Sequence, residues 1–365
     1  MKKFKSFLAS DKNSALLSSV LAIIVGFVFG FLILLISNPQ NAFSGFATII
    51  SGGFAGGLRG VGDVFYYAVP VMLTGLGVAF AFKTGLFNIG GPGQFIFGAY
   101  CAVLVAIKFT FLPGILKWIV PIIAAMIGGA LWAAIPGLLN AYFKVNIVIA
   151  TIMMNYIGMY LTNYFIKLTV YDSTKNTTLP VPSGSTLPTG GLDKIFPASS
   201  INIGIYIALL AVVIIYILLE KTKLGYELKA CGYNRDAAKY AGMNEKRNII
   251  VSMMISGALM GLGGAIMYLS ASGNYIAVVE VLAPEGFNGI PVALLALNNP
   301  LGVFFSAIFI SYIRVAGFYM QSHGFVPEII DIIISTIIYF SAFALVLRGI
   351  ITKAVLKSEI EGNGG

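Results

Sequence analysis

Residues 249–270 read IIVSMMISGALMGLGGAIMYLS and contain no charged side chain. A membrane-spanning helix needs about 20 mostly apolar residues to cross about 30 Å of hydrocarbon. This stretch meets that requirement, so the sequence predicts a transmembrane helix here. We therefore use windows without charged residues to locate candidate membrane spans in the rest of the chain.

Nine further windows bring the number of hydrophobic segments to ten. They cover residues 15–36, 64–82, 94–107, 118–142, 145–166, 201–219, 286–297, 301–320 and 329–347. Windows 94–107 and 286–297 are short, so we expect broken or tilted segments there, and full spanning stays open. The predicted fold class is all-α, a polytopic membrane protein with about ten transmembrane helices.

The composition excludes a soluble enzyme. Of the 365 residues, 58% are hydrophobic and 10% are charged, whereas soluble domains have about 45–50% and about 25%. So few charged side chains do not cover a soluble globule with polar surface. The predicted organisation is a cytoplasmic N-terminus (1–14), a transmembrane domain (15–348) and a cytoplasmic tail (349–365), with the first helix retained as a signal anchor.

The net charge of +9 indicates how the chain is oriented. If ten spans start inside, sixteen of the 23 Lys and Arg fall in inner segments, six fall in outer connections, and Arg314 lies within a window. Cytoplasmic loops of membrane proteins carry such an excess. Both termini are therefore expected in the cytoplasm, and the basic surplus does not indicate nucleic-acid binding.

Two connections are long and polar. Residues 167–200, on the predicted outer side, are rich in Thr, Ser, Pro and Gly and suit a loop or cap with short strands. Residues 220–248, on the inner side, contain NRDAAKYAG (234–242), in which Asn234 suits a helix N-cap, Asp236 its first turn and Gly242 its end.

The predicted helix in the inner connection carries Ala237, Ala238 and Ala241, which we expect on one face. A small, flat face suits docking into a groove of a partner. An ordinary amphipathic connector on the membrane surface explains the pattern equally well, so both interpretations stay open.

No catalytic or metal-binding pattern is present in the sequence. The chain has one His and two Cys and lacks GxxxxGK[ST], CxxC and HExxH, so no phosphate loop, catalytic triad, zinc site or disulfide framework is predicted. The acidic residues fall at segment ends, whereas ion-coupled carriers usually bury acidic relays. We expect no covalent chemistry, no metal and no cofactor in this chain.

Neutral polar residues interrupt three of the hydrophobic segments. The run FNIGGPGQ (87–94) and the run GFNGIP (286–291) are Gly/Pro breaks, and Asn155 lies within another window. Unwound backbone at membrane depth is tolerated where it lines a cavity or is buried in protein. The candidate path residues for an uncharged, hydroxyl-rich solute are Phe87, Asn88, Gln94, Asn155 and Asn288; the alternative is that these side chains join helices.

Four motifs in order resemble bacterial ABC-transporter permeases of the branched-chain amino acid/ribose type, in the nucleoside and simple-sugar branch. They are TGLFNIGGPGQFIFGAY (84–100), ATIMMNYIG (150–158), GYNRDAAKYAGM (232–243) and GFNGIPVALLALNNPLGV (286–303), within a resemblance that covers about residues 60–350. One position departs from the family pattern: Pro92 stands where an acidic residue is expected. A carboxylate role is therefore in doubt there, and the proline stiffens the break.

The resemblance implies one of two permease subunits of a nucleoside importer in the bacterial cytoplasmic membrane. The implied partners are a second permease, a shorter paralogue; a cytoplasmic ATPase that binds ATP and Mg; an extracytoplasmic substrate-binding lipoprotein; and membrane lipid. The family's ATPase-coupling helix corresponds to the segment that contains Gly232, Asn234, Arg235, Asp236, Ala237, Ala238, Ala241 and Gly242. The alternatives are an ABC permease for ribose or galactose and, from another class, an ion-coupled secondary transporter.

Overall fold

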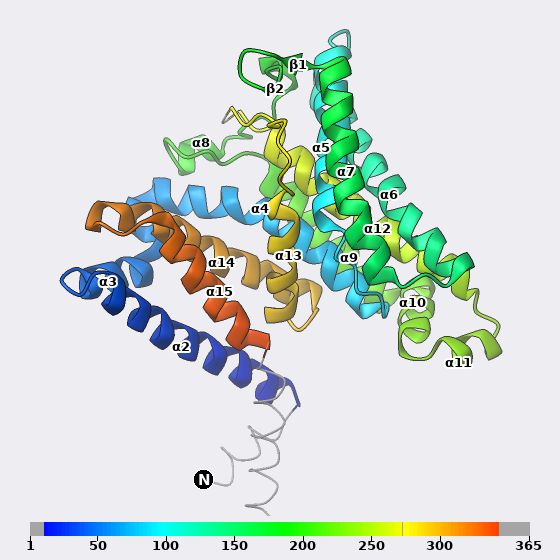
Figure 1. Cartoon of the computed structure of the whole chain (residues 1–365), viewed down its shortest axis with the longest axis horizontal. Helices are drawn as coiled ribbons and strands as arrows, with labels where there is room; N and C mark the ends of the chain where they lie inside the picture. Colours follow the sequence, from blue (N-terminus) through cyan, green and yellow to red (C-terminus); the bar gives the residue numbers. More distant parts are fainter. Residues whose placement is uncertain (1–10, 272, 343–365) are drawn as a thin grey trace, which may run out of the picture. The chain divides into compact units, whose positions relative to one another are not determined.

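The computed structural model describes residues 11–271 and 273–342 of the chain. The described chain is nearly all-α and divides into two compact units, residues 1–55 with 312–365 and residues 56–311 (Figure 1). The terminal parts of the predicted organisation, residues 1–10 and 343–365 with the tail 349–365, lie outside the described residues.

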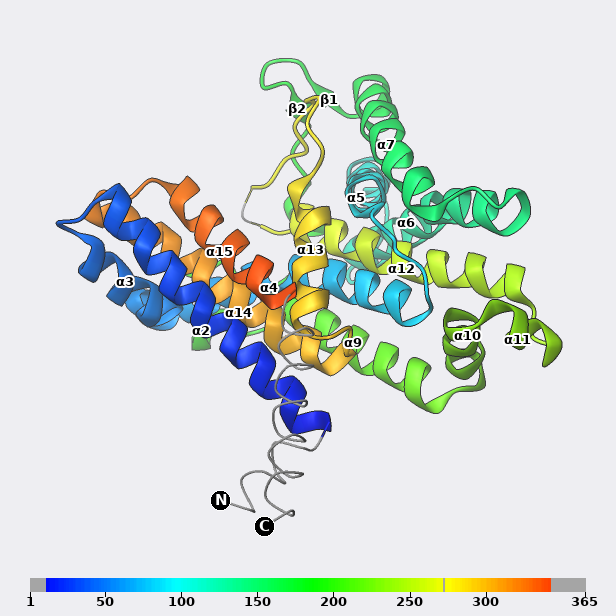
Figure 2. The ribbon, with the colours of Figure 1, turned by 60° about the horizontal axis from the view of Figure 1, so that its bottom comes forward.

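The larger unit, residues 56–311, contains most of the helices (Figures 1 and 2). They are α4 (Gly57–Lys83), α5 (Gly91–Lys108), α6 (Leu116–Phe143), α7 (Ile147–Thr169), α9 (Gly204–Lys221), α10 (Lys223–Tyr233), α11 (Arg235–Tyr240), α12 (Glu245–Tyr268), α13 (Pro284–Leu295) and the first part of α14 (Pro300–Met320). Helix α12 is central, because it packs against α4, α5 and α6.

Glycines bring the backbones around α12 into direct contact. Gly257 lies against the carbonyl of Gly129 in α6, and Gly261 lies against Ala125 in α6 and Gly98 in α5. In a membrane the hydrophobic effect does not drive helices together, so they associate through close packing. Small residues spaced four apart allow this close approach. Gly257 and Gly261, four residues apart in α12, therefore form a close-packed contact with α6.

The smaller unit pairs the two ends of the chain. It contains α2 (Asp11–Ser37), α3 (Ala42–Ser51), η1 (Gly52–Gly56) at its boundary, the end of α14, η3 (Gln321–His323) and α15 (Pro327–Ala342). Helix α2 packs along α15, and the Tyr312 hydroxyl donates a hydrogen bond of 2.7 Å to the Ile50 carbonyl. The sequence did not predict α3, because the charge-free window that contains it has no boundary after α2.

Within the described residues each of the ten predicted windows overlaps a helix, but ten spans are not confirmed. Within the described residues, six stretches are long and apolar enough to cross a membrane: Ala42–Lys83, Gly91–Lys108, Leu116–Phe143, Gly204–Lys221, Glu245–Tyr268 and Pro300–His323. Helix α13 is short at 12 residues, and the polar side chains of α7 lower its hydropathy. Window 94–107 forms a full-length helix, while the other short window, 286–297, does not.

The long connection between α7 and α9 is ordered and contains short strands, as predicted. Strands β1 (Tyr171–Asp172) and β2 (Thr177–Thr178) pair antiparallel, and η2 (Ser183–Ser185) and α8 (Leu192–Ile195) follow. At the hairpin turn the hydroxyl and the backbone amide of Thr174 both donate to Asp172, which lowers the pKa of that carboxyl. This hairpin and the α10–α11 connection lie at different ends of the larger unit (Figures 1 and 2).

Candidate functional site

An unwound break separates α4 from α5. Helix α4 ends at Lys83, Gly85 adopts a positive φ of 75°, and α5 begins at Gly91 with Pro92 in its first turn. The positive φ suits glycine, which has no Cβ, and a first-turn proline loses no helical hydrogen bond. The predicted break at 87–94 is therefore confirmed in part: the chain is unwound over residues 84–90, and residues 91–94 already form the first turn of α5.

Two buried amide side chains, those of Asn88 and Gln94, stabilise this break by hydrogen bonds within it. The Asn88 Nδ2 donates to Gln94 Oε1 at 3.0 Å and to Ser256 Oγ at 2.9 Å. The Asn88 Oδ1 accepts from the Gly90 amide at 2.9 Å and from Gln94 Nε2 at 3.1 Å. Asn88 and Gln94 are 0% and 1% exposed, so their hydrogen-bonding groups serve the break and the neighbouring α12.

Asn155 ties α7 to the same break. Its Oδ1 accepts from the Gly93 amide at 2.9 Å, and its Nδ2 donates to the Ile89 carbonyl at 3.0 Å. Backbone groups freed by unwinding need partners inside a membrane protein. The Asn155 side chain supplies two of them and is itself buried.

Residues 286–291 are not unwound as predicted but form the first turns of α13, in which Pro291 is tolerated. Glycine contacts bring this helix onto the break between α4 and α5. Gly286, at the start of α13, lies against the backbone of Gly91 and Pro92, and Gly289 lies against Thr74 and Gly75 of α4. Three motifs that are far apart in the sequence, 84–100, 150–158 and 286–303, therefore meet around residues 88–93. Any side chain at Gly286 overlaps this backbone.

The structure places the five candidate path residues in different environments. Asn88, Gln94 and Asn155 belong to the buried cluster described above. Phe87 is 39% exposed, with its ring centroid 4.8 Å from that of Phe82, and Asn288 is half-buried on α13. Direct contact of these residues with a solute stays a prediction.

Ser256 is a member of the cluster that the sequence reasoning missed. Its hydroxyl donates to the Gly77 carbonyl at 2.7 Å while accepting from Asn88. Ser252, one turn earlier on α12, forms a hydrogen bond with Thr84 at the end of α4. The available signal was a pair of serines four residues apart in an otherwise apolar window.

The predicted short helix in the inner connection is confirmed as α11, Arg235–Tyr240. Asn234 caps it by accepting from the Ala237 amide at 3.0 Å, Asp236 lies in the first turn, and Gly242 follows it with a φ of 78°. Arg235 lies 3.9 Å from Glu245 of α12. The cap and the ion pair hold α11 against the end of α12.

The exposed surface of α11 differs from the predicted alanine face. Ala237 and Ala241 are exposed, but Ala238 is only 4% exposed. Adjacent residues on a helix point about 100° apart, which turns Ala238 toward the protein. The most exposed large side chains of this segment are Tyr233, at 90%, and Tyr240, at 94%.

A glycine contact joins the α10–α11 segment to the break. Gly232, in the last turn of α10, lies against Thr84 and Gly85, and a Cβ added to Gly85 would lie 2.5 Å from the Gly232 Cα. Here backbone meets backbone, with no flexible side chain between the two elements. A displacement of α10 would therefore also displace Thr84 and Gly85, the first residues of the break.

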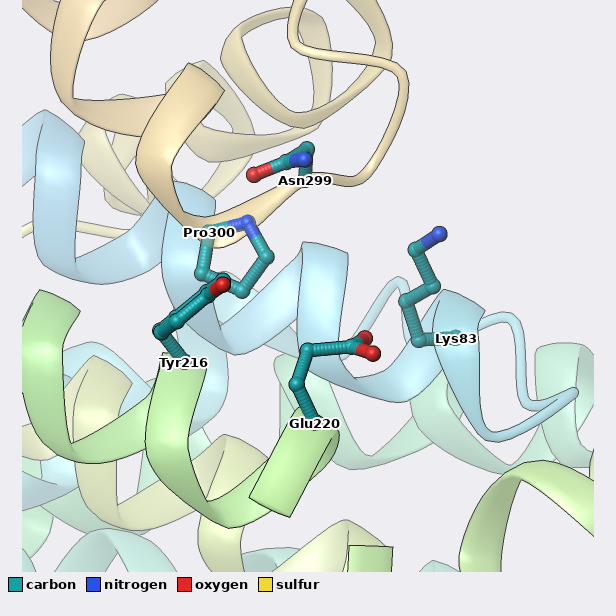
Figure 3. A pocket seen from close by; sticks show the side chains of 5 residues that line it. All are labelled: Lys83, Tyr216, Glu220, Asn299 and Pro300. Carbon is teal, nitrogen blue, oxygen red and sulfur yellow. The ribbon is translucent and has the colours of Figure 1, made fainter. Parts of the chain in front are cut away.

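A cavity of about 270 Å³ lies beside this contact, between α4, α9 and the start of α14. Figure 3 shows Lys83 and Glu220 extending into it from α4 and α9, with Tyr216, Asn299 and Pro300 around them. Glu220 also accepts from Lys229 of α10 at 3.0 Å. The cavity is thus lined by charged side chains, and it shares α4 with the Gly232 contact.

Metal binding has no visible basis in residues 11–271 and 273–342. No group of three or more His, Cys, Asp or Glu side chains there is placed to hold a metal ion. The polar cluster around Asn88 consists instead of amides, hydroxyls and backbone groups.

Curated relatives match nearly the whole chain. The guanosine ABC transporter permease protein NupP of Bacillus subtilis is 40% identical over 341 residues, 93% of this chain and 97% of its own. The nucleoside ABC transporter permease protein NupB of Lactococcus lactis is 34% identical over 350 residues, 94% and 95% of the two chains. NupQ, a guanosine ABC transporter permease protein also from B. subtilis, is 27% identical over 254 residues, 67% and 77%.

The family assignment agrees with the motifs that meet at the break. No solved structure matches the chain. The family model described as branched-chain amino acid transport system / permease component matches residues 60–347, which include the break, α13 and the α10–α11 segment. The chain therefore belongs to this family of multi-pass ABC-transporter permeases.

Proposed function

We propose that this chain is the membrane-spanning permease subunit of an ATP-driven importer for nucleosides. Its similarity to NupP and NupB over more than nine-tenths of its length supports this substrate class. It is a transport subunit and not an enzyme, so ATP and Mg²⁺ belong to a partner ATPase.

One observation carries the coupling part of the proposal: Gly232 and Gly85 join a surface helix pair to the central break. The excess of Lys and Arg in residues 220–248 supports a cytoplasmic position for α10 and α11. ATP hydrolysis in the partner displaces α11, α10 moves with it, and the Gly232 contact shifts the start of the break. The break and α13, packed backbone to backbone, then change access to the path.

A second permease completes the path. NupP has the related guanosine permease NupQ in the same bacterium, and this chain is similar to both, which supports a paralogue as partner. We place the assembly in the bacterial cytoplasmic membrane with both termini inside, and an extracytoplasmic lipoprotein delivers the solute. Phe87 and Asn288, which retain exposed surface, are the candidate solute contacts.

The substrate class is tested by uptake. Cells that lack the gene are expected to lose most accumulation of radiolabelled uridine and guanosine and to keep ribose accumulation, because NupP and NupB, which match 93% and 94% of this chain, are named as guanosine and nucleoside permeases. Complementation with the intact gene is the control. Loss of ribose uptake alone would assign the protein to simple sugars, and uptake driven by an ion gradient in ATP-free vesicles would assign it to secondary transporters.

Tyr240 is expected to anchor the ATPase. It is 94% exposed on α11, and exposed aromatics that become buried at an interface dominate binding energy. Tyr240→Ala should weaken ATPase binding about 30-fold, which corresponds to about 2 kcal/mol, measured by titration of purified ATPase onto the permease pair in nanodiscs. Tyr206→Ala, at a tyrosine that is 52% exposed on α9, is the matched control. Equal binding by both variants would contradict this docking surface.

A further inference from the structure

A second cavity, of about 240 Å³, lies at the end of α12 that is remote from α10 and α11. One wall comes from the end of α12 and the residues that follow it: Tyr268, Ser270, Ala271, Gly273, Asn274 and Tyr275. The other wall comes from the long connection after β2: Pro180, Val181, Ser183 and Thr186. None of the functions assigned above uses it.

Backbone hydrogen bonds fix the two walls to each other. The Thr178 amide donates to the Ile276 carbonyl at 3.0 Å, the Val278 amide to the Asn176 carbonyl at 2.9 Å, and the Leu187 amide to the Leu269 carbonyl at 2.8 Å. These bonds flank the cavity on both sides. The cavity is therefore a built feature of the fold, since its walls do not depend on a single loop.

Hydrogen-bonding groups on the α12 wall remain available to a ligand. The Asn274 Nδ2 donates to the Tyr66 hydroxyl at 2.8 Å and to the Met267 carbonyl at 3.1 Å, which holds the amide in place. Its Oδ1 accepts no hydrogen bond from the described part of the chain, and the Tyr268 hydroxyl likewise makes none there. Two residues that line the cavity, Asn274 and Tyr268, thus keep a hydrogen-bonding atom that no described protein group occupies.

The lining combines aromatic rings with neutral polar groups and contains no charged side chain. Lys175 is close by, but its ammonium group lies over the Tyr275 ring, 5.5 Å from the centroid. Aromatic rings stack on any nucleobase, and hydroxyls and amides hydrogen-bond a ribose without needing charge. A phosphate group finds no cationic partner in this lining. The volume lies just below the range of about 300–1,000 Å³ typical of ligand pockets, which suits one small solute.

We propose that this cavity is an entry site that receives a single nucleoside, and not a nucleotide, before it reaches the break. The inference rests on the proposed nucleoside import and on the outer position of the long connection. Tyr268 and Tyr275 offer their rings to the base, and Asn274 and Ser183 offer hydrogen bonds to the ribose. The solute released by the extracytoplasmic partner meets these residues first.

The test uses 4-thiouridine, a nucleoside that reacts covalently with neighbouring side chains on ultraviolet irradiation. Membranes that contain the whole transporter are irradiated with the radiolabelled probe, and adducts are mapped by mass spectrometry. We expect adducts on the peptides that contain residues 180–186 and 268–275, suppressed by excess uridine and not by uridine 5′-phosphate. Uptake of the probe by wild-type and deletion cells is measured in parallel.

Two variants and one control separate binding from misfolding. Tyr275→Ala should lower the adduct yield at subsaturating probe about tenfold, in line with the loss of one stacked base. Ala271→Trp fills the cavity and retains every reactive side chain, so it should remove the adducts as well. Tyr206→Ala, an exposed tyrosine outside the cavity, should leave them unchanged. All three proteins must reach the membrane at wild-type abundance.

The outcomes distinguish this inference from the function on which it rests. Uptake of 4-thiouridine without adducts on either wall, or with adducts unaffected by Ala271→Trp, overturns the entry site and leaves nucleoside import standing. Equal suppression by uridine and uridine 5′-phosphate overturns the proposed selectivity and with it the site. No difference in probe uptake between wild-type and deletion cells overturns the nucleoside function and the entry site together.

Discussion

Gly232→Ala is expected to abolish nucleoside uptake while the protein still inserts into the membrane. A Cβ at Gly232 would lie 2.6 Å from the Thr84 carbonyl carbon and 2.8 Å from the Gly85 amide nitrogen. Both are backbone atoms, so neither moves aside as a flexible side chain would. Overpacking of this kind costs about 1–3 kcal/mol, and here it separates α10 from the break. We expect uptake to fall at least tenfold and ATP hydrolysis by the assembled transporter to lose its dependence on solute.

Gly114→Ala is the matched control for this change. A Cβ at Gly114 would meet no atom within 4 Å, although its φ of 48° makes the substitution strained. The control therefore carries more backbone strain than Gly232→Ala and no steric overlap. Uptake, membrane abundance and ATPase activity are compared for the two variants. Normal, solute-dependent transport by Gly232→Ala would show that the Gly232–Gly85 contact does not transmit movement.

Asn88→Ala is expected to destabilise the protein by at least about 3 kcal/mol. The change removes the shared partner of the Gly90 amide, the Ser256 hydroxyl and both groups of the Gln94 amide. Each buried polar group left without a partner costs about 1–3 kcal/mol, and Asn88 is 0% exposed. The midpoint of thermal unfolding in detergent should therefore fall strongly, and uptake should fall with it.

Asn146→Ala provides the comparison for Asn88→Ala. Asn146 is an exposed N-cap of α7 that accepts from the Val148 amide at 2.9 Å, and loss of such a cap costs about 1 kcal/mol. An unfolding midpoint of Asn88→Ala no lower than that of Asn146→Ala would contradict a structural role. Reduced affinity for solute with unchanged stability would then assign Asn88 to the path, the other interpretation of the sequence.

Local patterns in the sequence predicted the short-range structure well. The cap at Asn234, the first-turn Asp236 and the terminating Gly242 define α11 because capping depends on neighbours within four residues. The Gly/Pro pattern also predicted the unwound residues between α4 and α5 correctly, because Gly and Pro act on their own backbone. The break predicted at 286–291 was wrong, since these residues lie within helix α13. An apolar run without charges does not show where one helix ends and the next begins. For this reason the sequence did not predict α3 as a separate helix.

The face that a residue presents depends on partners far away in the chain. Ala238 and Ala241 were indistinguishable as small residues of one helix, yet only Ala238 is buried. Asn88, Gln94 and Asn155 looked like path residues, and the structure directs their amides to one another, to Ser256 and to backbone groups of the break. Packing between helices decides which side chains are buried and which hydrogen bonds they form. The spacing of residues along the chain does not predict either property.

By itself, the sequence determined that this is a multi-pass membrane protein with a Gly/Pro break between α4 and α5 and one capped, basic surface segment. Those properties follow from hydropathy, charge and local backbone preferences, which each residue carries wherever it lies. Only the tertiary structure brought Gly232 onto Gly85, and Gly286 onto Gly91 and Pro92. Glycine has no side chain whose hydropathy or charge could indicate a distant partner. These backbone contacts between elements are therefore known only from the packing of the helices.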